Sequence, residues 1–569
     1  MIRTVSSIVL GAALAVALWT PRAEACGCFA PPDPTVPIVQ AGERILFAAE
    51  NGKVTAHIQI QYAGDAKDFG WLLPLPSVPT LKVGTEELFT QLIATTQPRY
   101  FVQVQATGNC LNGRGGFGFG GLAPSAAGGA ENDSSRAGET PLVIQSSIGP
   151  YDYAVLKADN KDAMLKWLAD NRYFIPVGTE DVVGPYINPG AYFLALKLQS
   201  GKAAGDIQPV VLEYPSQLPM IPIILTSVAA NPNMGIQVWM LGNGRAIPRN
   251  YRHVVINDSQ LDWFNQARNY NDVVIRAVSE APEKHAFVTE YAGPADVMRD
   301  VLDGPGRFGT QDALASQQTP IDFVEHLFNN GFIPPPANQP GFGGPVRFQQ
   351  VLPPALKSIV LSQIPYPAAL RGVADEDEFL RRIDFYLGSY RQQNPQAFVG
   401  YESRFDPQTL AAEIFEKVVK PAREAGALFK QFPTLTRLYT TLSPQDMTRD
   451  PVFSYNPTLA PVSRDHTATY EVNCGIAGDT FSSPGRLVTE QGWSLKYPNG
   501  RQQNPERELV VGPSALRVET LAEEGAPIVD LDNSLPIRKV EGCGGCSAVS
   551  PMGLGLVALL AALRRRRGT

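Results

Sequence analysis

The chain contains 569 residues with a formal net charge of −7, and 44% of its residues are hydrophobic and 18% charged. This composition is typical of a globular protein, and the length suggests about two to four domains with ample material for hydrophobic cores. The 51 glycines and 49 prolines indicate many loops and turns and argue against a long helical bundle.

Residues 1–25 have the pattern of a secretory signal peptide. An uncharged apolar stretch over 5–19 follows a basic residue, and Ala23-Glu24-Ala25 gives the small-x-small pattern of a cleavage site. We expect signal peptidase to cut after Ala25, so that the mature chain begins at Cys26. The alternative is a lipoprotein signal with an acylated Cys26. That signal usually has Leu where Ala23 stands, so we favour ordinary cleavage.

Residues 26–293 predict a β-rich domain of the α+β class with a largely antiparallel sheet. Asn51-Gly52 is a strong hairpin signal between two predicted strands, 44–50 and 53–62. Apolar and polar residues alternate in the second strand. We therefore expect one buried face and one face in water, with His57 on the solvated side.

Further elements of this domain follow in chain order. A helix is predicted over 86–96, a strand over 100–105, and a second helix after Asn160, whose side chain can cap it. Five more strands are predicted, over 191–198, 208–214, 221–228, 235–241 and 252–256.

Residues 107–141 are dominated by Gly, Ala, Ser and Asn, and we predict a long mobile loop inserted in the first domain. The loop contains a formal match to the dinucleotide-binding fingerprint at 113–118. A true site of this kind needs a helix that opens directly after the glycines, whereas more glycines and Pro124 follow here. We therefore expect no cofactor.

The pattern becomes helical over 294–442, and a small β-rich region is predicted over 443–540. The helices of the first region are predicted over 320–328, 354–364, 376–391 and 409–432. The strands of the second region are predicted over 469–473, 487–497 and 509–511.

Residues 541–569 have the pattern of a sorting tag, with Cys543 and Cys546 before an apolar segment and a basic end. The segment 548–563 has no charge, and its sixteen residues would span about 24 Å as a helix, against a hydrocarbon core of about 30 Å. We predict a single C-terminal transmembrane helix, short for a permanent anchor. The basic end favours the cytoplasmic side and consists of Arg564, Arg565, Arg566 and Arg567.

Loss of the signal peptide and the tail would leave an acidic body. Those segments hold six basic residues and one acidic residue, so 42 basic and 54 acidic residues remain, with a net charge of −12. Nucleic acid binding needs clustered cations, so we expect no nucleic acid partner.

An oxidising compartment outside the cytoplasm favours disulfides among Cys26, Cys28, Cys110 and Cys474. The first two are too close to pair comfortably with each other, so we expect each to reach Cys110 or Cys474, and three connectivities stay open. Redox catalysis is disfavoured, because a Cys-x-x-Cys motif needs a thioredoxin-like strand-to-helix context that 543–546 lacks.

The sequence carries no recognisable catalytic signature. It has neither a Gly-x-Ser-x-Gly elbow nor a phosphate-binding Gly-Lys-Thr/Ser loop, and we predict no metal site because no two histidines have metal-binding spacing. Asp465-His466 could orient an imidazole, but adjacent residues on a strand point to opposite faces. The five histidines are His57, His253, His285, His326 and His466.

Two parts of the chain resemble known families. The tail resembles the MYXO-CTERM sorting signal of myxobacteria and relatives, which implies that a dedicated membrane protease processes it and leaves the protein on the cell surface. The first half resembles an exported bacterial family known as domain of unknown function 2330, for which no catalytic residues are assigned. This second resemblance lies in the blocks 25–29, 40–47, 70–76, 167–169 and 247–251.

We therefore expect an exported protein at the cell surface or outer envelope of a Gram-negative bacterium, anchored in the membrane transiently or permanently. Its expected partners are signal peptidase, a C-terminal sorting protease and the membrane itself. A non-catalytic binding or envelope protein is the favoured function. The alternative is a secreted hydrolase assembled from residues distant in sequence, which a deep pocket with convergent acidic, His or Ser groups would favour.

Overall fold

The structure, a computed structural model, describes residues 28–29, 40–59, 69–108, 110, 141–173, 175, 180–202, 206–333, 350–475, 478–501 and 512–534. It is a mixed α+β fold with large sheets, as predicted. In these ranges no helix combines the length and the apolar character that crossing a membrane requires. The signal peptide, the sorting tag with segment 548–563, and 111–140 of the predicted loop lie outside the described residues.

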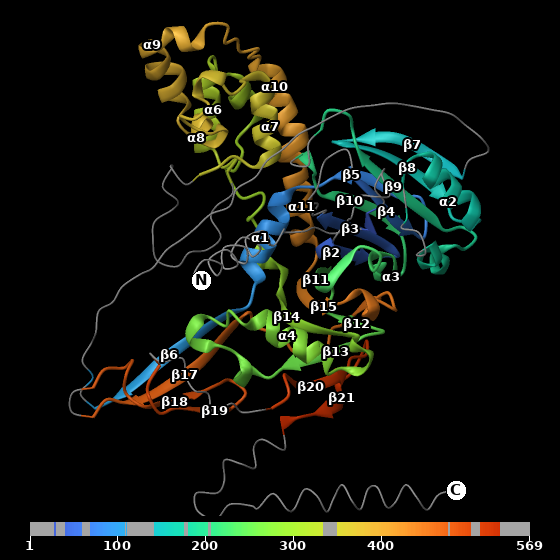
Figure 1. Cartoon of the computed structure of the whole chain (residues 1–569), viewed down its shortest axis with the longest axis vertical. Coiled ribbons are helices and arrows are strands. Elements are labelled where there is room, and N and C mark those ends of the chain that lie inside the picture. The colour runs from blue at the N-terminus through green and yellow to red at the C-terminus, as the bar shows by residue number, and fades with distance from the viewer. Residues whose placement is uncertain are drawn as a thin grey trace, which may run out of the picture.

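Two β-sheets form the centre of the molecule (Figure 1). Their strands are β1 (Cys28–Phe29), β2 (Gln40–Glu50), β3 (Lys53–Gln59), β4 (Gly70–Leu75), β5 (Thr80–Val83), β7 (Leu142–Ile148), β8 (Tyr151–Lys157), β9 (Tyr192–Leu198), β10 (Val210–Pro215), β11 (Ala230–Gly242), β13 (Arg252–Ile256), β14 (Ala286–Pro294), β15 (Thr434–Leu442), β20 (Ala515–Thr520) and β21 (Ile528–Asp532). The larger sheet has the order β21-β20-β13-β14-β15-β11-β2-β3-β10-β5, and the smaller one β1-β4-β9-β8-β7. Only β2 with β11 and β13 with β14 pair in parallel among these described strands.

The ten-stranded sheet unites distant parts of the chain. Strands β20 and β21 come from the predicted C-terminal β-rich region and extend the sheet beside β13. Long-range pairing of this kind leaves no local signal in the sequence. The predicted domain limits near residues 293 and 442 stay predictions.

Helices cover the outer faces of both sheets, so that the central body is layered. Helices α1 (Glu86–Thr96) and α11 (Lys420–Gln431) bury apolar side chains against the larger sheet. Helix α2 (Lys161–Asp170) does so against the smaller sheet. Each predicted start has its cap: Thr85 Oγ1 accepts from the Glu87 amide and Asn160 Oδ1 from the Ala163 amide.

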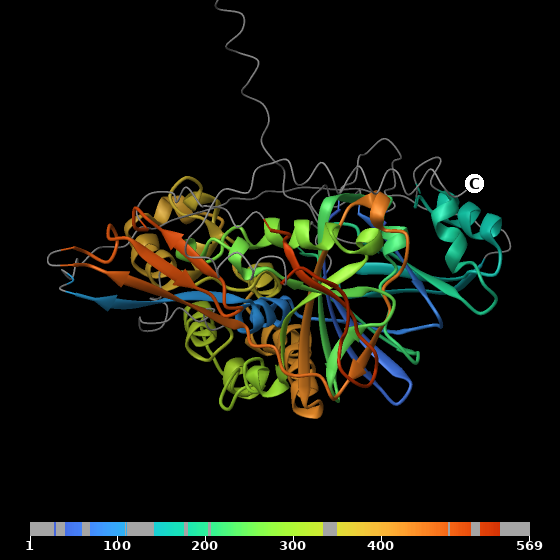
Figure 2. The same ribbon diagram turned by 90° about the horizontal axis from the view of Figure 1, so that it is seen from below.

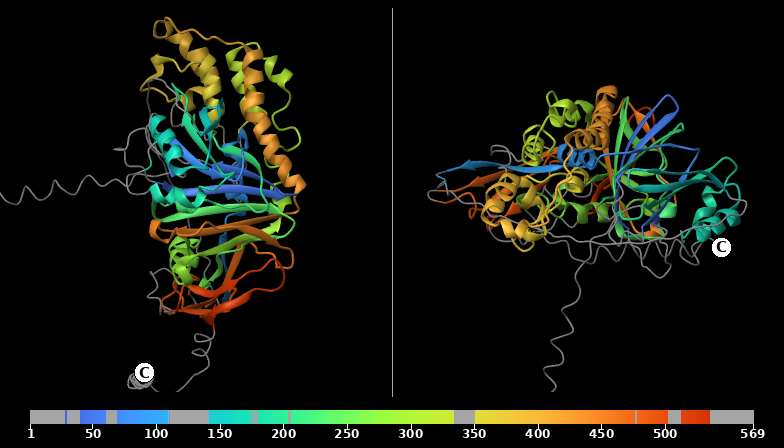
Figure 3. Two further views of the ribbon diagram at one scale, coloured as in Figure 1. Left: turned by 90° about the vertical axis from the view of Figure 1, so that its right-hand side faces the viewer. Right: turned by 90° about the horizontal axis from the view of Figure 1, so that it is seen from above.

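A helical lobe is inserted between two neighbouring strands of the large sheet. Pro294 at the end of β14 is paired with Thr434 at the start of β15, so the chain leaves and re-enters the sheet at one place. The lobe has its own apolar core, and a helix runs from it onto the sheets (Figure 3). Its helices are α5 (Gln311–Ala315), α6 (Pro320–Asn329), α7 (Pro354–Gln363), α8 (Glu376–Arg381), α9 (Arg391–Gln393) and α10 (Pro407–Ile414), with π-helical turns at Asp384–Tyr390 and Phe415–Val419.

A four-stranded sheet extends away from the two packed sheets (Figures 1 and 2). Its strands, in spatial order, are β19 (Ser494–Tyr497), β18 (Gly485–Val488), β17 (Asp465–Asn473) and β6 (Arg99–Thr107). A disulfide joins Cys110, just after β6, to Cys474, just after β17. The expectation that each of these two cysteines pairs with Cys26 or Cys28 is therefore wrong. The parallel pairing of β6 with β17 is what brings them together.

The remaining elements complete the connections around the sheets. They are helices α3 (Ile223–Thr226) and α4 (Tyr270–Ser279) and a two-stranded ribbon of β12 (Arg245–Pro248) with β16 (Phe453–Asn456). The strand predicted over 221–228 is wrong, because the structure has the short helix α3 there. A short apolar run is compatible with either a buried strand or a buried helix, so its pattern alone does not distinguish them. Pro222 precedes α3, and Asp450 Oδ1 accepts from the Ile224 amide at its start. The strand expected over 487–497 is instead the hairpin β18–β19, which turns at Gly492 with φ of 84°.

The hairpin of β2 and β3 forms as expected, with the apolar face of β3 buried. The prediction that His57 lies on a solvated face is wrong, because the residue is only 4% exposed. Its partner across the sheet is Leu46, which belongs to the same buried cluster as Phe89 of α1. The helix thus covers the face that the alternation assigned to water.

Candidate functional site

An apolar cavity of about 300 Å³ lies between the two central sheets, and we call it the inter-sheet cavity. Strands β2, β3 and β10 of the large sheet form one wall, and β4 of the small sheet forms the other. The turns around α3 and the 3₁₀ helix Glu180–Tyr186 close its end. The lining residues are Glu43, Ile45, Phe47, Ala56, Ile58, Leu73, Pro74, Leu75, Pro76, Pro185, Tyr186, Asn188, Ala191, Leu212, Tyr214, Ser216, Leu218, Met220 and Pro222.

Glu43 is the only Asp, Glu, Lys, Arg or His among the described residues that line this cavity. It stands two and four positions before Ile45 and Phe47 on β2, so strand alternation turns all three side chains to the same face. The residue is 6% exposed, and its Oε2 has no hydrogen-bond partner among the described residues. Burial and, to a smaller extent, the nearby charge of Asp450 together raise the pKa of Glu43 to about 8.

Asp450 is a second carboxyl group close to this end of the cavity, behind the wall. Its Oδ1 accepts hydrogen bonds from the Tyr186 hydroxyl at 3.0 Å and from the Ile224 amide at 3.0 Å. Burial raises the pKa of Asp450 to about 6, although both hydrogen bonds act to lower it. Tyr186 also lines the cavity, so its phenol connects the wall to Asp450.

The rest of the wall consists mainly of aliphatic and aromatic side chains and prolines. Binding sites for small molecules are typically apolar hollows with a few well-placed polar groups. A buried carboxyl oxygen without a partner also costs free energy unless something pairs with it. The inter-sheet cavity therefore has the shape and chemistry of a binding site for a small apolar molecule with one polar group.

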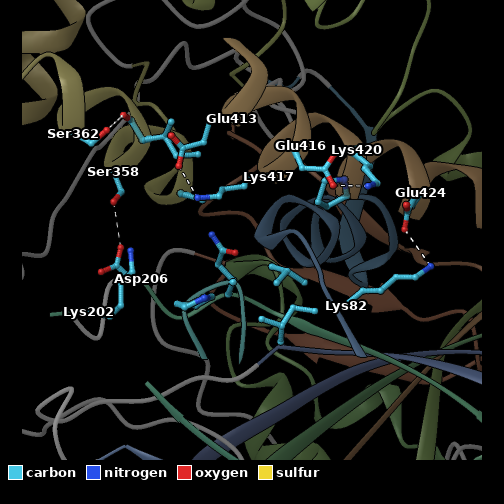
Figure 4. Close-up of a pocket in the computed structure, with 18 residues that line it drawn as sticks. Lys82, Lys202, Asp206, Ser358, Ser362, Glu413, Glu416, Lys417, Lys420 and Glu424 are labelled. Atoms are coloured by element: carbon cyan, nitrogen blue, oxygen red, sulfur yellow. Dashed lines mark hydrogen bonds and ion pairs between the residues drawn. The ribbon is translucent and has the colours of Figure 1, made fainter. Parts of the chain in front are cut away.

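A second hollow, of about 480 Å³, lies where the helical lobe meets the sheets, and we call it the interface cleft. Figure 4 shows lysine and acidic side chains along its walls. Its labelled lining residues are Lys82, Lys202, Asp206, Ser358, Ser362, Glu413, Glu416, Lys417, Lys420 and Glu424.

The charged groups of the interface cleft largely neutralise one another. Lys417 Nζ lies 2.5 Å from Glu413 Oε1 one helical turn away, and Lys420 pairs with Glu416 in the same way. Two contacts cross the cleft (Figure 4): Lys82 Nζ to Glu424 Oε2 at 3.5 Å, and the Ser358 hydroxyl to Asp206 Oδ1 at 3.2 Å.

Most of these side chains are also well exposed to solvent, so their ion pairs are weak. The lining contains four lysines and four acidic residues, so the cleft has no net charge to select a ligand. Its geometry is that of a contact between lobe and body. The inter-sheet cavity is therefore the better candidate.

The structure separates Asp465 from His466. Asp465 Oδ1 pairs with Arg99 Nε at 2.6 Å, whereas His466 Nδ1 lies 3.1 Å from Glu490 Oε2 and its ring stacks on Tyr100. The two adjacent side chains thus have different partners and form no catalytic pair. His253 is buried against Glu519, with Nδ1 to Oε2 at 3.0 Å. The described part of the chain contains no group of three His, Cys, Asp or Glu side chains that could hold a metal ion.

The sorting and processing residues lie outside the described residues, whereas the predicted disulfide residues Cys110 and Cys474 are brought together. The former set comprises Ala25, Cys26, Cys543, Cys546, Arg564, Arg565, Arg566 and Arg567.

Sequence reasoning did not identify Glu43 or Asp450. Glu43 had a readable signal: it directly precedes the predicted strand 44–50 and is in phase with Ile45 and Phe47, and the observed strand β2 begins earlier, at Gln40, and includes it. Asp450 had no such signal, since it lies far along the chain and only the fold brings it against Tyr186 of the cavity wall.

Comparison with known proteins agrees with the resemblance found in the N-terminal half. Residues 20–316 match the model of a family described as uncharacterized protein conserved in bacteria (DUF2330). No curated protein and no solved structure matches the chain. Two blocks that carried the resemblance, 40–47 and 70–76, supply Glu43 and much of both walls of the inter-sheet cavity.

Proposed function

The chain belongs to the DUF2330 family of uncharacterized bacterial proteins, and we propose that it is an exported, surface-anchored protein that binds a small apolar molecule without transforming it. The observation that carries this proposal is the inter-sheet cavity, with its apolar walls and the unpartnered buried oxygen of Glu43. The hollow is of a size that suits a small ligand.

Export and anchoring rest on the two ends of the chain. The pattern over 1–25 supports cleavage before Cys26, and the tag over 541–569 supports sorting to the surface. We propose that segment 548–563 holds the chain in the membrane until Cys543 or Cys546 is processed. A binding protein displayed on the outside would have its cavity open to molecules in the surroundings of the cell.

A hydrolase remains the second candidate, because two carboxyl groups with raised pKa lie near one end of the cavity. Glu43 has the properties of a general acid. Asp450, however, does not line the cavity and already accepts two hydrogen bonds, so no second group is presented as a base or nucleophile. Turnover that is lost in Glu43→Gln while substrate binding persists would favour the hydrolase.

The test of binding uses a neutral apolar probe and a pair of matched variants. 2-Phenylethanol should bind to the full chain in isothermal titration calorimetry. Ala191 is a half-buried residue on the cavity wall, so the larger side chain of Ala191→Phe should fill part of the cavity and abolish this binding. Ala355→Phe makes the same change at a half-buried residue of the interface cleft and should leave binding intact. Binding that is absent, or that only Ala355→Phe abolishes, would contradict the proposal.

A further inference from the structure

We infer that the molecule bound in the inter-sheet cavity carries one cationic group, an amine or ammonium, that lies beside Glu43. This inference rests on the proposed function and specifies its ligand. It follows from an imbalance of charge in the cavity: an acidic group faces the hollow with no basic group to match it.

The polar groups of the described lining are a carboxyl, two phenols, the Asn188 amide and the Ser216 hydroxyl, and none of them is cationic. Glu43 comes from β2, Tyr214 from β10 and Tyr186 from the helix that closes the end, with Asp450 behind Tyr186. The described residues of β3 and β4 add only apolar side chains to the lining. No Lys, Arg or His is among the described lining residues.

The neighbouring basic residue on β2 does not compensate for this. Arg44 follows Glu43 directly, and alternation turns it to the opposite face of the sheet, where its Nη1 donates to Gln59 Oε1 at 3.1 Å. An ionised Glu43 therefore has no counter-ion, which is why burial disfavours its charged form so strongly.

A cationic ligand would supply the missing partner. Its ammonium could donate to the free Oε2 of Glu43 and would also be attracted by the charge of Asp450. At pH 8, where Asp450 and about half of the Glu43 side chains are ionised, an anionic ligand such as a fatty acid carboxylate would be repelled. The volume suits a molecule of about ten non-hydrogen atoms, since one water occupies about 30 Å³ in the liquid.

Proton linkage gives this inference a signature. The free protein holds a proton on Glu43 up to about pH 8, and a cation binds best to the ionised carboxylate. Binding therefore releases a proton, and affinity should rise with pH by up to about tenfold per unit below the pKa of Glu43. A neutral ligand of the same shape should show little such dependence.

The experiment compares three probes of similar shape on the full chain by calorimetry: 2-phenylethylamine, 2-phenylethanol and phenylacetate. We expect the amine to bind at least about tenfold more tightly than the alcohol at pH 8, a difference of about 1.4 kcal/mol. Its affinity should fall on the order of tenfold or more at pH 6, while phenylacetate should not bind in the cavity.

Two variants locate the effect. Glu43→Gln should remove the advantage of the amine and its pH dependence but keep binding of the alcohol, which also shows that the variant is folded. Glu413→Gln removes an equivalent charge from the interface cleft and should leave both the advantage of the amine and its pH dependence unchanged.

The outcomes separate this inference from the proposed function. If the alcohol binds but the amine binds no more tightly, or if the affinity for the amine does not rise with pH, the inference of a cationic ligand is wrong and the proposed binding function stands. If no probe binds, both fail. If Glu43→Gln does not fold, the pH dependence of the unmodified chain decides the question.

Discussion

The two hollows of this protein differ in how their polar groups are satisfied. The interface cleft is larger and has many charges, but three of its lysines pair with three of its acidic residues along one helix or across the gap. The inter-sheet cavity has one carboxyl group, and that group has an oxygen without a partner. The number of charged residues is therefore a poor guide to a binding site, whereas an unmatched buried group in an apolar hollow is informative.

The largest expected effect tests whether Glu43 is neutral in the fold. Because its folded pKa of about 8 lies above the unfolded value of 4.5, its contribution to stability is present below pH 4.5 and lost as pH rises towards 8. Between pH 5 and pH 8 the free energy of unfolding of the unmodified chain should fall by about 3 kcal/mol relative to that of Glu43→Gln. Urea unfolding of both proteins, followed by tryptophan fluorescence, measures this difference.

Comparison with the variant is essential because His57 acts in the opposite direction. Burial lowers the pKa of His57 to about 4, so the neutral side chain favours folding as pH rises from about 4 to 6.5. That contribution is common to both proteins and cancels. A stability difference that stays constant from pH 5 to pH 8 would show that Glu43 is not buried in an apolar site.

A smaller effect is expected at Asp450, whose folded pKa of about 6 lies above the unfolded value of 3.8. Its contribution to stability is lost as pH rises from about 4 to 6. Between pH 5 and pH 8 the free energy of unfolding of Asp450→Asn should therefore rise by about 1 kcal/mol relative to that of the unmodified chain. The amide oxygen can still accept from Tyr186 and the Ile224 amide. A double variant with Glu43→Gln should be non-additive, because the charge of Asp450 raises the pKa of Glu43. Strict additivity would mean that the two carboxyl groups are independent.

The smallest effect is expected in the interface cleft. Glu413→Gln removes a solvent-exposed ion pair one helical turn long, and such pairs contribute at most about 0.5 kcal/mol. The same urea unfolding should therefore give almost the same stability at pH 5 and pH 8 as for the unmodified chain. If Glu413→Gln altered the pH dependence of the free energy of unfolding as much as Glu43→Gln does, the distinction between the two hollows would be lost.

Local patterns allowed much of the fold to be predicted. The helix over 86–96 forms with the predicted bounds, and the hairpin at Asn51-Gly52 forms between the predicted strands. Both depend on capping, turn chemistry and side-chain periodicity, which neighbouring residues determine.

What sequence could not supply was long-range packing. The burial of His57 depends on α1 crossing the sheet, and the pairing of Cys110 with Cys474 depends on β6 lying beside β17. The candidate site has the same origin, since Asp450 reaches the neighbourhood of Glu43 only when β2 and the turn after β15 meet at one end of the cavity.

The most direct test of the binding site is a crystal structure of the full chain grown with 2-phenylethylamine at pH 8. The account predicts the ligand between the two sheets, with its nitrogen within hydrogen-bonding distance of Glu43 Oε2 and the interface cleft free of ligand. A ligand found in the interface cleft, or an inter-sheet cavity left empty at a saturating concentration, would contradict it.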